Sequence, residues 1–240
     1  MDTGAEGPGA SLEALRAVAQ SCRACPLAAE RQHVVFGDGD PGARLMIVGE
    51  APGRQEDEQG RPFVGAAGQL LDRILAACGI AREEVFITNT VMCRPPGNRV
   101  PTDDERAACR PFFDRKMDLI GPRIVVLLGA TAAQSILGPQ LRITRDRGKP
   151  VERDGVTYVP TFHPAALLRD PEKKRPVWED MQLVRDMYRA LAARDRVPAA
   201  ASPVGPTDGR SPAEAPAPDT GTPLDRARQA RLAFDPPDRP

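Results

Sequence analysis

Three side chains that could do chemistry stand where short apolar stretches of the sequence end. They are a carboxylate, Glu50, an amide, Asn89, and an imidazole, His163. A carboxylate can activate water, an amide both donates and accepts hydrogen bonds, and an imidazole can hold or transfer a proton. If the stretches are strands of one open α/β sheet, the three groups converge, because ligands of such sheets bind beyond the carboxyl ends of the strands. We therefore predict one crevice lined by all three.

Two of these residues also have a plainer structural interpretation. Asparagine is a poor strand former, so Asn89 either reads the polar edge of a flat ring or satisfies neighbouring backbone groups. His163 precedes a proline, which fixes its backbone in the extended region. It is either a catalytic imidazole or a capping or core residue. His33 lies in a polar stretch, and we expect it to take no part in the chemistry.

The stretch 49–68 is rich in glycine and acid and reads GEAPGRQEDEQGRPFVGAAG. It lacks the Gly-Lys-Ser/Thr end of a P-loop and the glycine spacing of a dinucleotide-binding fingerprint. Four carboxylates beside a Pro-Gly turn suggest a site that handles a water or a cation; they are Glu50, Glu56, Asp57 and Glu58. We expect Asp57 and Glu58 to be solvated in a charged loop. Phe63 is either a core anchor for this loop or a platform on which a flat ring stacks.

Four of the five cysteines form a candidate metal site. Cys22 and Cys25 are a Cys-x-x-Cys pair, and Cys93 and Cys109 enclose a segment rich in proline, glycine and charge. Four thiolates suit either a zinc ion or an iron–sulfur cluster, and spacing alone does not decide between them. The wide second pair is unlike a zinc-ribbon knuckle, which favours iron–sulfur, and four unrelated reduced thiols are the alternative. Cys78 lies on the apolar face of a predicted helix, so we expect a core residue.

Two basic segments flank the predicted crevice. The first includes Arg145, and the second begins with Arg169. On a chain with no net charge they suit local phosphate contacts, although such segments are often plain solvated surface. Leu167 and Leu168 precede the second segment on a predicted loop, and an exposed pair there could enter a DNA duplex as a wedge.

Strands and helices alternate along the chain. The predicted strands are short apolar or β-branched runs at 44–48, 85–91, 123–128 and 157–162. The predicted helices have apolar residues at helical spacing and span 12–20, 65–77, 102–119, 130–137 and 178–193. Thr102 and Glu105 have the spacing of a capping box at the start of the third helix. This alternation predicts an α/β fold with a doubly wound, mostly parallel sheet.

Composition is that of an ordinary globular domain with an appended tail. The 240 residues are 41% hydrophobic, and their 33 basic and 33 acidic side chains argue against a protein that coats nucleic acid by bulk charge. No apolar run approaches the roughly 18 residues of a membrane span, and no secretory signal is apparent, so we expect a cytoplasmic protein. Ten of the 26 prolines follow Arg196. We expect a catalytic domain at 11–195 and a disordered Pro/Ala-rich tail at 196–240.

Together these motifs resemble the family 4 uracil-DNA glycosylases of bacteria and archaea. The similarity extends over about residues 22–188. It is carried by the segments 22–27, 49–57, 60–65, 88–98, 128–131 and 161–165, together with Cys109. These motifs are long, ordered and multiple, which makes a chance match improbable.

The resemblance implies a [4Fe-4S] cluster with a structural role, held by Cys22, Cys25, Cys93 and Cys109. It implies a three-layer α/β/α sandwich around a four-stranded sheet. It also implies roles around a bound uracil: Phe63 stacks on the ring, Asn89 bonds to its Watson–Crick edge, His163 donates to its O2 atom, and Glu50 places water. Gly49 and Ala51, on either side of Glu50, would complete the base site.

One position departs from another branch of the superfamily, which has an aspartate where this chain has Ala51. Water activation is therefore expected from Glu50, or from Glu56 reaching in. A further branch binds DNA covalently through a histidine in an inserted basic loop. This chain has no histidine between His33 and His163, so we expect no covalent intermediate.

We therefore expect a DNA repair hydrolase that flips uracil out of single- or double-stranded DNA and hydrolyses its N-glycosidic bond. We expect a monomer with no membrane partner, and a replication or repair partner could bind the tail. Two other functions remain open: an iron–sulfur electron-transfer or redox-sensing protein, and a non-catalytic module that docks on a DNA polymerase.

Overall fold

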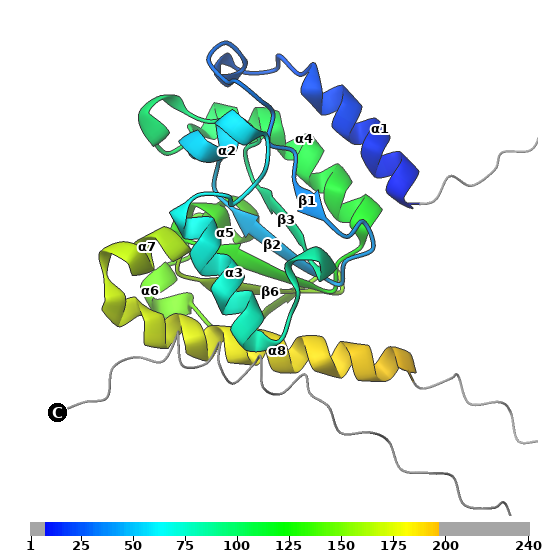
Figure 1. Cartoon of the computed structure of the whole chain (residues 1–240), viewed down its shortest axis with the longest axis vertical. Coiled ribbons are helices and arrows are strands. Elements are labelled where there is room, and N and C mark those ends of the chain that lie inside the picture. Colours follow the sequence, from blue (N-terminus) through cyan, green and yellow to red (C-terminus); the bar gives the residue numbers. More distant parts are fainter. Residues whose placement is uncertain (1–7, 197–240) are drawn as a thin grey trace, which may run out of the picture.

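A computed structural model describes residues 8–196 of the chain and shows a mixed, mostly parallel sheet between helices (Figure 1). In the described residues the sheet has six strands in the order β1-β3-β2-β4-β6-β5. The four central strands are parallel, and β1 and β5 pair antiparallel at the two edges. The strands are β1 (Asp38–Gly39), β2 (Leu45–Gly49), β3 (Phe86–Asn89), β4 (Ile124–Leu128), β5 (Val151–Arg153) and β6 (Val156–Thr161).

The four predicted strands are confirmed as the parallel centre of the sheet, but the prediction of a four-stranded sheet is wrong. The additional strands carry none of the pattern that reveals a buried strand. β1 is two residues long, and all three residues of β5 are exposed. Short exposed strands at a sheet edge have no apolar face to show in the sequence.

All five predicted helices are present, with boundaries that differ by up to four residues. They are α1 (Pro8–Gln20), α3 (Ala66–Cys78), α4 (Asp103–Ile120), α5 (Ala130–Leu137) and α8 (Lys174–Arg196). Three short helices were not expected: α2 (Arg54–Gln59), α6 (Ile143–Asp146) and α7 (Pro164–Arg169). The capping box at the start of α4 is confirmed, because the Thr102 side chain accepts from the Glu105 N–H and the Glu105 carboxylate accepts from the Thr102 N–H.

Helices cover both faces of the sheet, which gives the predicted three layers. Alternate side chains of a strand enter two separate cores: in β2, Met46 and Val48 face one, and Leu45 and Ile47 face the other. The first core includes residues of α1, α4 and α5, and the second includes residues of α3, α7 and α8. A strand that is buried on both faces needs apolar residues throughout, which is why β2 and β4 read as continuous apolar runs.

No helix in the described part of the chain is long and apolar enough to cross a membrane. The predicted disordered tail lies outside the described residues, apart from Arg196, which ends α8. Cys78 is buried at the end of α3 among the second core, as its position on the apolar helix face indicates.

Burial on α3 should dominate its contribution to stability. Leu71 is 1% exposed in the second core, whereas its neighbour Gln69 is exposed. Leu71→Ala is expected to lower the free energy of unfolding by about 2–5 kcal/mol, the usual cost of truncating a buried leucine. Gln69→Ala, on the same helix, should change it by less than about 0.5 kcal/mol. Denaturant unfolding followed by circular dichroism measures both, and equal effects would contradict the assignment of the buried face.

Candidate functional site

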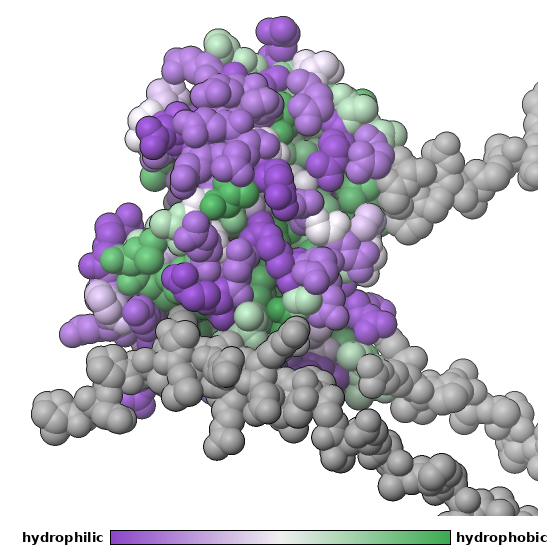
Figure 2. All heavy atoms as spheres, viewed as in Figure 1, coloured by the Kyte–Doolittle hydropathy of each residue, from purple (hydrophilic) through white to green (hydrophobic). Residues whose placement is uncertain are grey.

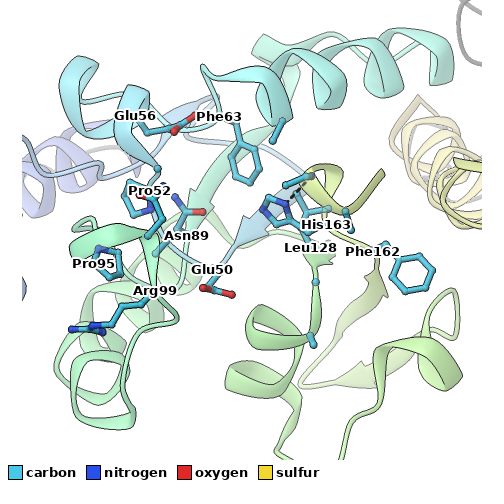
Figure 3. A pocket seen from close by; sticks show the side chains of 18 of the residues that line it. Glu50, Pro52, Glu56, Phe63, Asn89, Pro95, Arg99, Leu128, Phe162 and His163 are labelled. Atoms are coloured by element: carbon cyan, nitrogen blue, oxygen red, sulfur yellow. Dashed lines mark hydrogen bonds between the residues drawn. The ribbon is translucent and has the colours of Figure 1, made fainter. Parts of the chain in front are cut away.

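A cavity of about 540 Å³ lies beyond the carboxyl ends of the parallel strands (Figure 3). Glu50 follows β2, Asn89 ends β3, and His163 follows β6, and all three line the cavity. The predicted convergence of these side chains is therefore confirmed. In the sheet, β3 lies on one side of β2 and β4 lies on the other, so the strand order reverses at β2. The cavity lies at this reversal, which is where open α/β sheets bind their ligands.

Gly49 allows the close approach that shapes the floor of this cavity. A Cβ atom at position 49 would lie 2.3 Å from the Asn89 side-chain oxygen and 2.6 Å from the Phe63 ring. The backbone beyond β2 is further tied to the segment after β3, since the Glu50 carbonyl accepts from the Val91 N–H and the Thr90 hydroxyl. Gly49 thus lets the amide and the phenyl ring meet over one strand end.

The Glu50 side chain extends from this tied backbone into the cavity (Figure 3). The carboxylate is partly buried, and the described residues offer it no ion-pair partner. Ala51 and Pro52 line the cavity directly after it. A carboxylate held in this way is free to accept a proton from a water molecule in the cavity.

The Asn89 side chain is buried, and its Oδ1 atom has no hydrogen-bond partner in the described structure. A buried acceptor without a partner costs about 1–3 kcal/mol, so native proteins leave few of them. Because this oxygen belongs to a cavity-lining residue, a ligand with an N–H or O–H group can satisfy it. The alternative, an amide satisfied by neighbouring backbone, does not hold for the oxygen.

Phe63 is held in a conformation that most residues avoid. Its φ angle is 52°, in the left-handed region that is unfavourable for a residue with a Cβ. The Arg82 guanidinium donates to the carbonyls of Pro62 and Phe63, and Gly68 lets α3 start so close that a Cβ there would lie 1.9 Å from the Phe63 carbonyl oxygen. The ring is thereby fixed against the cavity before any ligand arrives. Its centre lies 5.7 Å from the centre of the His163 ring, with an angle of 27° between the two planes.

Glu56 contributes to the same fixation. Its Oε1 atom accepts from the N–H groups of Val64 and Gly65, at 2.9 and 2.8 Å, directly after Phe63. Glu56 also lines the cavity, and in Figure 3 its carboxylate points toward the Phe63 loop. Of the two candidate carboxylates, Glu56 is therefore engaged by backbone, and Glu50 is free.

The expectation that Asp57 is solvated in a loop is wrong. Residues 54–59 form α2, and Asp57 is 2% exposed. Its carboxylate accepts from the N–H groups of Gln32 and His33, and the His33 ring donates to the Asp57 carbonyl. Asp57 and His33 together attach α2 to the segment before β1. Glu58 is exposed, as expected.

His163 has a defined tautomer. Its backbone is extended, with φ −68° and ψ 138°, and Pro164 begins α7. The Nδ1 atom caps this helix by accepting from the Ala165 N–H at 3.1 Å. A neutral imidazole that accepts at Nδ1 carries its proton on Nε2. The capping and the functional interpretation are thus compatible, because the cap fixes which nitrogen can donate to a ligand.

The imidazole is also kept uncharged. Burial and, to a smaller extent, the nearby Arg169 lower the pKa of His163 to about 4, against an opposing effect of Glu56. At neutral pH the ring is a neutral N–H donor.

The greater part of the sequence matches a known family. Residues 36–182 match the model of the uracil DNA glycosylase superfamily. A type-4 uracil-DNA glycosylase of Thermotoga maritima is 45% identical over 174 residues, which cover 71% of this chain and 91% of that protein. The chain belongs to the type-4 uracil-DNA glycosylases. Two further type-4 uracil-DNA glycosylases are similar. That of Sulfurisphaera tokodaii is 43% identical over 74% of this chain and 84% of its own length. That of Pyrobaculum aerophilum is 41% identical over 72% of this chain and 92% of its own length.

In this type-4 uracil-DNA glycosylase the two leucines beside the cavity have different environments. Leu168 is 49% exposed on α7, but Leu167 is 1% exposed in the second core. The expectation that both reach DNA is therefore wrong for Leu167, because α7 is a helix and turns adjacent side chains to different sides. Figure 2 shows hydrophobic surface over the region of α7 with hydrophilic side chains around it.

The two arginines predicted to contact DNA also differ. Arg169 lines the cavity. Arg145 is exposed on α6 and pairs with Asp146, and it does not line the cavity, although Ile143 of the same helix does. Arg147, in the same basic segment, is largely structural: it forms a bidentate pair with the buried Asp180 of α8.

Sequence reasoning missed one wall of the cavity. Pro95, Asn98 and Arg99 line it, from the segment between Cys93 and Cys109. The Arg99 guanidinium makes two hydrogen bonds to the buried Glu105 carboxylate, at 2.8 and 2.6 Å, and this pairing lowers the pKa of Glu105 to about 2. In the sequence, this segment is marked only by its content of proline, glycine and charge, and these three residues were not predicted as part of the site.

The four cysteines of the predicted metal site lie near one another in this type-4 uracil-DNA glycosylase. Cys93 is close enough to interact electrostatically with Cys109 and Cys25, and Cys109 with Cys22. The Arg31 guanidinium donates to the Cys93 sulfur at 3.3 Å, and the Met92 N–H donates to the Cys109 sulfur. In the described residues no three possible ligands stand in coordinating geometry.

The protonation state of His163 can be measured directly. We expect its imidazole to stay neutral, with the proton on Nε2, until the pH falls to about 4. Because the pKa is lower in the folded chain than in the unfolded one, protonation favours unfolding, and this contribution to stability is lost as the pH falls from about 6.5 toward 4. Nitrogen-15 NMR across pH 3.5–8 tests this, and with two histidines in the chain the spectrum of His163→Gln assigns the signals. Titration near pH 6.5 would contradict the assignment.

Proposed function

We infer that this protein is a uracil-DNA glycosylase of base excision repair: it hydrolyses the N-glycosidic bond of uracil in DNA and leaves an abasic site. Membership of the type-4 family supports the reaction. The observation that carries the inference within the molecule is the unpaired oxygen of Asn89 in the cavity, because it offers a buried acceptor to a ligand that donates a hydrogen bond.

Uracil would be recognised at its polar edge and at its face. The Asn89 Oδ1 atom accepts from uracil N3–H, and the Asn89 amide nitrogen donates to uracil O4. Cytosine presents the opposite donor and acceptor pattern at these positions, so its binding would leave buried polar groups unpaired. Phe63, held in place by Glu56 and Arg82, offers its ring for stacking, and the backbone at Gly49 and Ala51 closes the base site.

His163 would stabilise the leaving group. As the glycosidic bond lengthens, negative charge develops on uracil O2. The Nε2–H group of a neutral imidazole can donate to this oxygen, and a donor placed before the reaction can lower the barrier by about 3 kcal/mol. The Ala165 N–H bond to Nδ1 fixes the ring in the orientation that this requires.

Glu50 would orient and deprotonate the water that attacks C1′ of the sugar. It is the cavity carboxylate without a partner among the described residues, and Ala51 after it carries no acid. Glu56 would act indirectly, by holding the backbone that follows Phe63. The sugar passes through a cation-like transition state, which a nearby carboxylate also stabilises.

DNA would be bound at the rim of the cavity while the target nucleotide turns into it. Leu168 is exposed next to the cavity-lining Arg169, which supports a role in filling the space that the flipped base would leave. Arg169 and Arg145 would contact phosphates on this side. Single-stranded DNA would be a substrate as well, since an unpaired base costs less to turn out.

We propose that Cys22, Cys25, Cys93 and Cys109 hold a [4Fe-4S] cluster. The surroundings of the cysteines support this proposal. Hydrogen bonds to the sulfurs of iron–sulfur centres are common, and N–H groups already donate to the sulfurs of Cys93 and Cys109. Burial raises the pKa of Cys93 to about 11, so without iron this thiol stays protonated. When bound, the cluster supplies metal–thiolate bonds that join the segment after α1 to α4, and the uracil reaction does not pass through it.

The function is tested by incubating purified protein with uracil-containing single- and double-stranded oligonucleotides, followed by alkali cleavage at abasic sites. We expect cleavage at uracil and none at cytosine. Asn89→Asp should slow uracil release about ten- to a hundred-fold, because a buried contact is lost, and should weaken discrimination against cytosine. An iron–sulfur redox protein or a non-catalytic polymerase module would give no abasic sites, and unchanged selectivity in Asn89→Asp would contradict the base-reading role.

The two carboxylates are separated by paired substitutions. Glu50→Gln is expected to lower kcat at least about a hundred-fold, as loss of a general base does. Glu56→Gln keeps a carbonyl oxygen for Val64 and Gly65 and should retain most of the activity, whereas Glu56→Ala frees the Phe63 loop and should raise KM. Steady-state kinetics on one uracil oligonucleotide distinguishes these outcomes. A kcat loss in Glu56→Gln equal to that of Glu50→Gln would instead place Glu56 at the water.

A further inference from the structure

One fully buried lysine has no part in the uracil site. Lys116 lies on α4 and is 0% exposed. Its ammonium group donates to the Thr88 hydroxyl at 3.0 Å and lies 4.3 Å from the centre of the Phe36 ring. The described residues provide no carboxylate for it.

Such a lysine is costly. Moving an ammonium group out of water costs several kcal/mol even after relaxation, and replacing buried charges with apolar residues of similar size is often stabilising. One hydroxyl and one aromatic ring compensate only part of this cost. Burial accordingly lowers the pKa of Lys116 to about 7, while a neighbouring Cys109 thiolate would act in the opposite direction. A methionine would fill the same space without this free-energy cost, so a lysine at this position implies an anion that stabilises its charged form.

Other cations are gathered at the same place. The Arg16 guanidinium of α1 lies 5.0 Å from the centre of the same Phe36 ring. Its Nε atom pairs with the mostly exposed Glu13 carboxylate at 3.3 Å. The guanidinium of Arg31 makes its hydrogen bonds to the Cys93 sulfur and to the carbonyls of Gln20 and Cys22.

Two of these cations, Lys116 and Arg31, lie beside the cysteines. Lys116 lies seven positions after Cys109 on the buried face of α4, which is about two helical turns. Long helical side chains lean toward the N-terminus of their helix, and here that direction leads toward Cys109. Arg31 contacts Cys93 and the backbone of Cys22. Lys116 is close enough to Cys109 for a thiolate there to act on its charge, and the described residues show no carboxylate paired with Lys116.

We propose that Lys116 is the buried counter-cation of the four-cysteine centre, where it offsets the negative charge of an iron–sulfur cluster. The proposal rests on the cluster proposed above. Four thiolates outweigh the positive charge of the iron–sulfur core, so the centre is anionic and desolvated. A cation beside it lowers the cost of that charge and favours the addition of an electron. Lys116 is thus a positioning residue for the cluster's charge and touches neither DNA nor uracil.

Lys116→Met in the cluster-loaded protein is the test, because methionine keeps the volume and removes the charge. We expect the midpoint potential of the cluster, measured by spectroelectrochemical titration, to shift to more negative values. We also expect iron release to a chelator, followed by loss of visible absorbance, to be several-fold faster. Circular dichroism at the same temperature should show an unchanged fold.

A control variant separates charge from packing. Phe113→Leu truncates a buried residue of the same helix that carries no charge. It should leave the potential close to that of the wild type. A potential and a release rate in Lys116→Met no different from those of Phe113→Leu would overturn the inference. Wild-type protein without iron and without a visible band would instead overturn the cluster.

Discussion

The uracil site depends on how closely three backbone segments approach one another at the end of β2. Gly49 has no side chain, and this absence lets the Asn89 amide and the Phe63 ring occupy the space that a Cβ would fill. Gly68 also lacks a side chain, and this allows the start of α3 to pack directly against the Phe63 carbonyl. The strained φ angle of Phe63 is maintained by hydrogen bonds from Arg82 and to Glu56. The site is therefore organised by backbone contacts before any substrate binds.

Much of this architecture could be predicted from the sequence, because the information was local. Strands that are buried on both faces must be apolar throughout, and polar residues directly after them must lie at the same sheet edge. These two constraints were sufficient to bring Glu50, Asn89 and His163 together. The capping role of His163 was one of two expected alternatives, and the structure shows that the cap uses Nδ1 and so leaves the proton on Nε2.

The remaining features depend on partners distant in sequence. Asp57 is buried because the N–H groups of Gln32 and His33 reach it across 25 and 24 residues, and no local pattern announces such a bond. The helix α2 is short and polar, so it has no apolar periodicity. Leu167 and Leu168 are adjacent and identical in type, and the direction in which α7 packs decides which one is buried. The edge strands are short and β5 is exposed, so they carry no apolar pattern either.

The Arg99–Glu105 pair has a consequence for how the cavity behaves. Arg99 belongs to one wall of the cavity, and Glu105 belongs to the first turn of α4, the helix that also carries Cys109 and Lys116. The wall is therefore attached to the longest helix on that face of the sheet and moves with it. An enzyme that inspects many bases for each one it removes gains from this attachment. The shape of its pocket is set during folding, and each incoming nucleotide must fit a wall that is held by the Arg99–Glu105 pair.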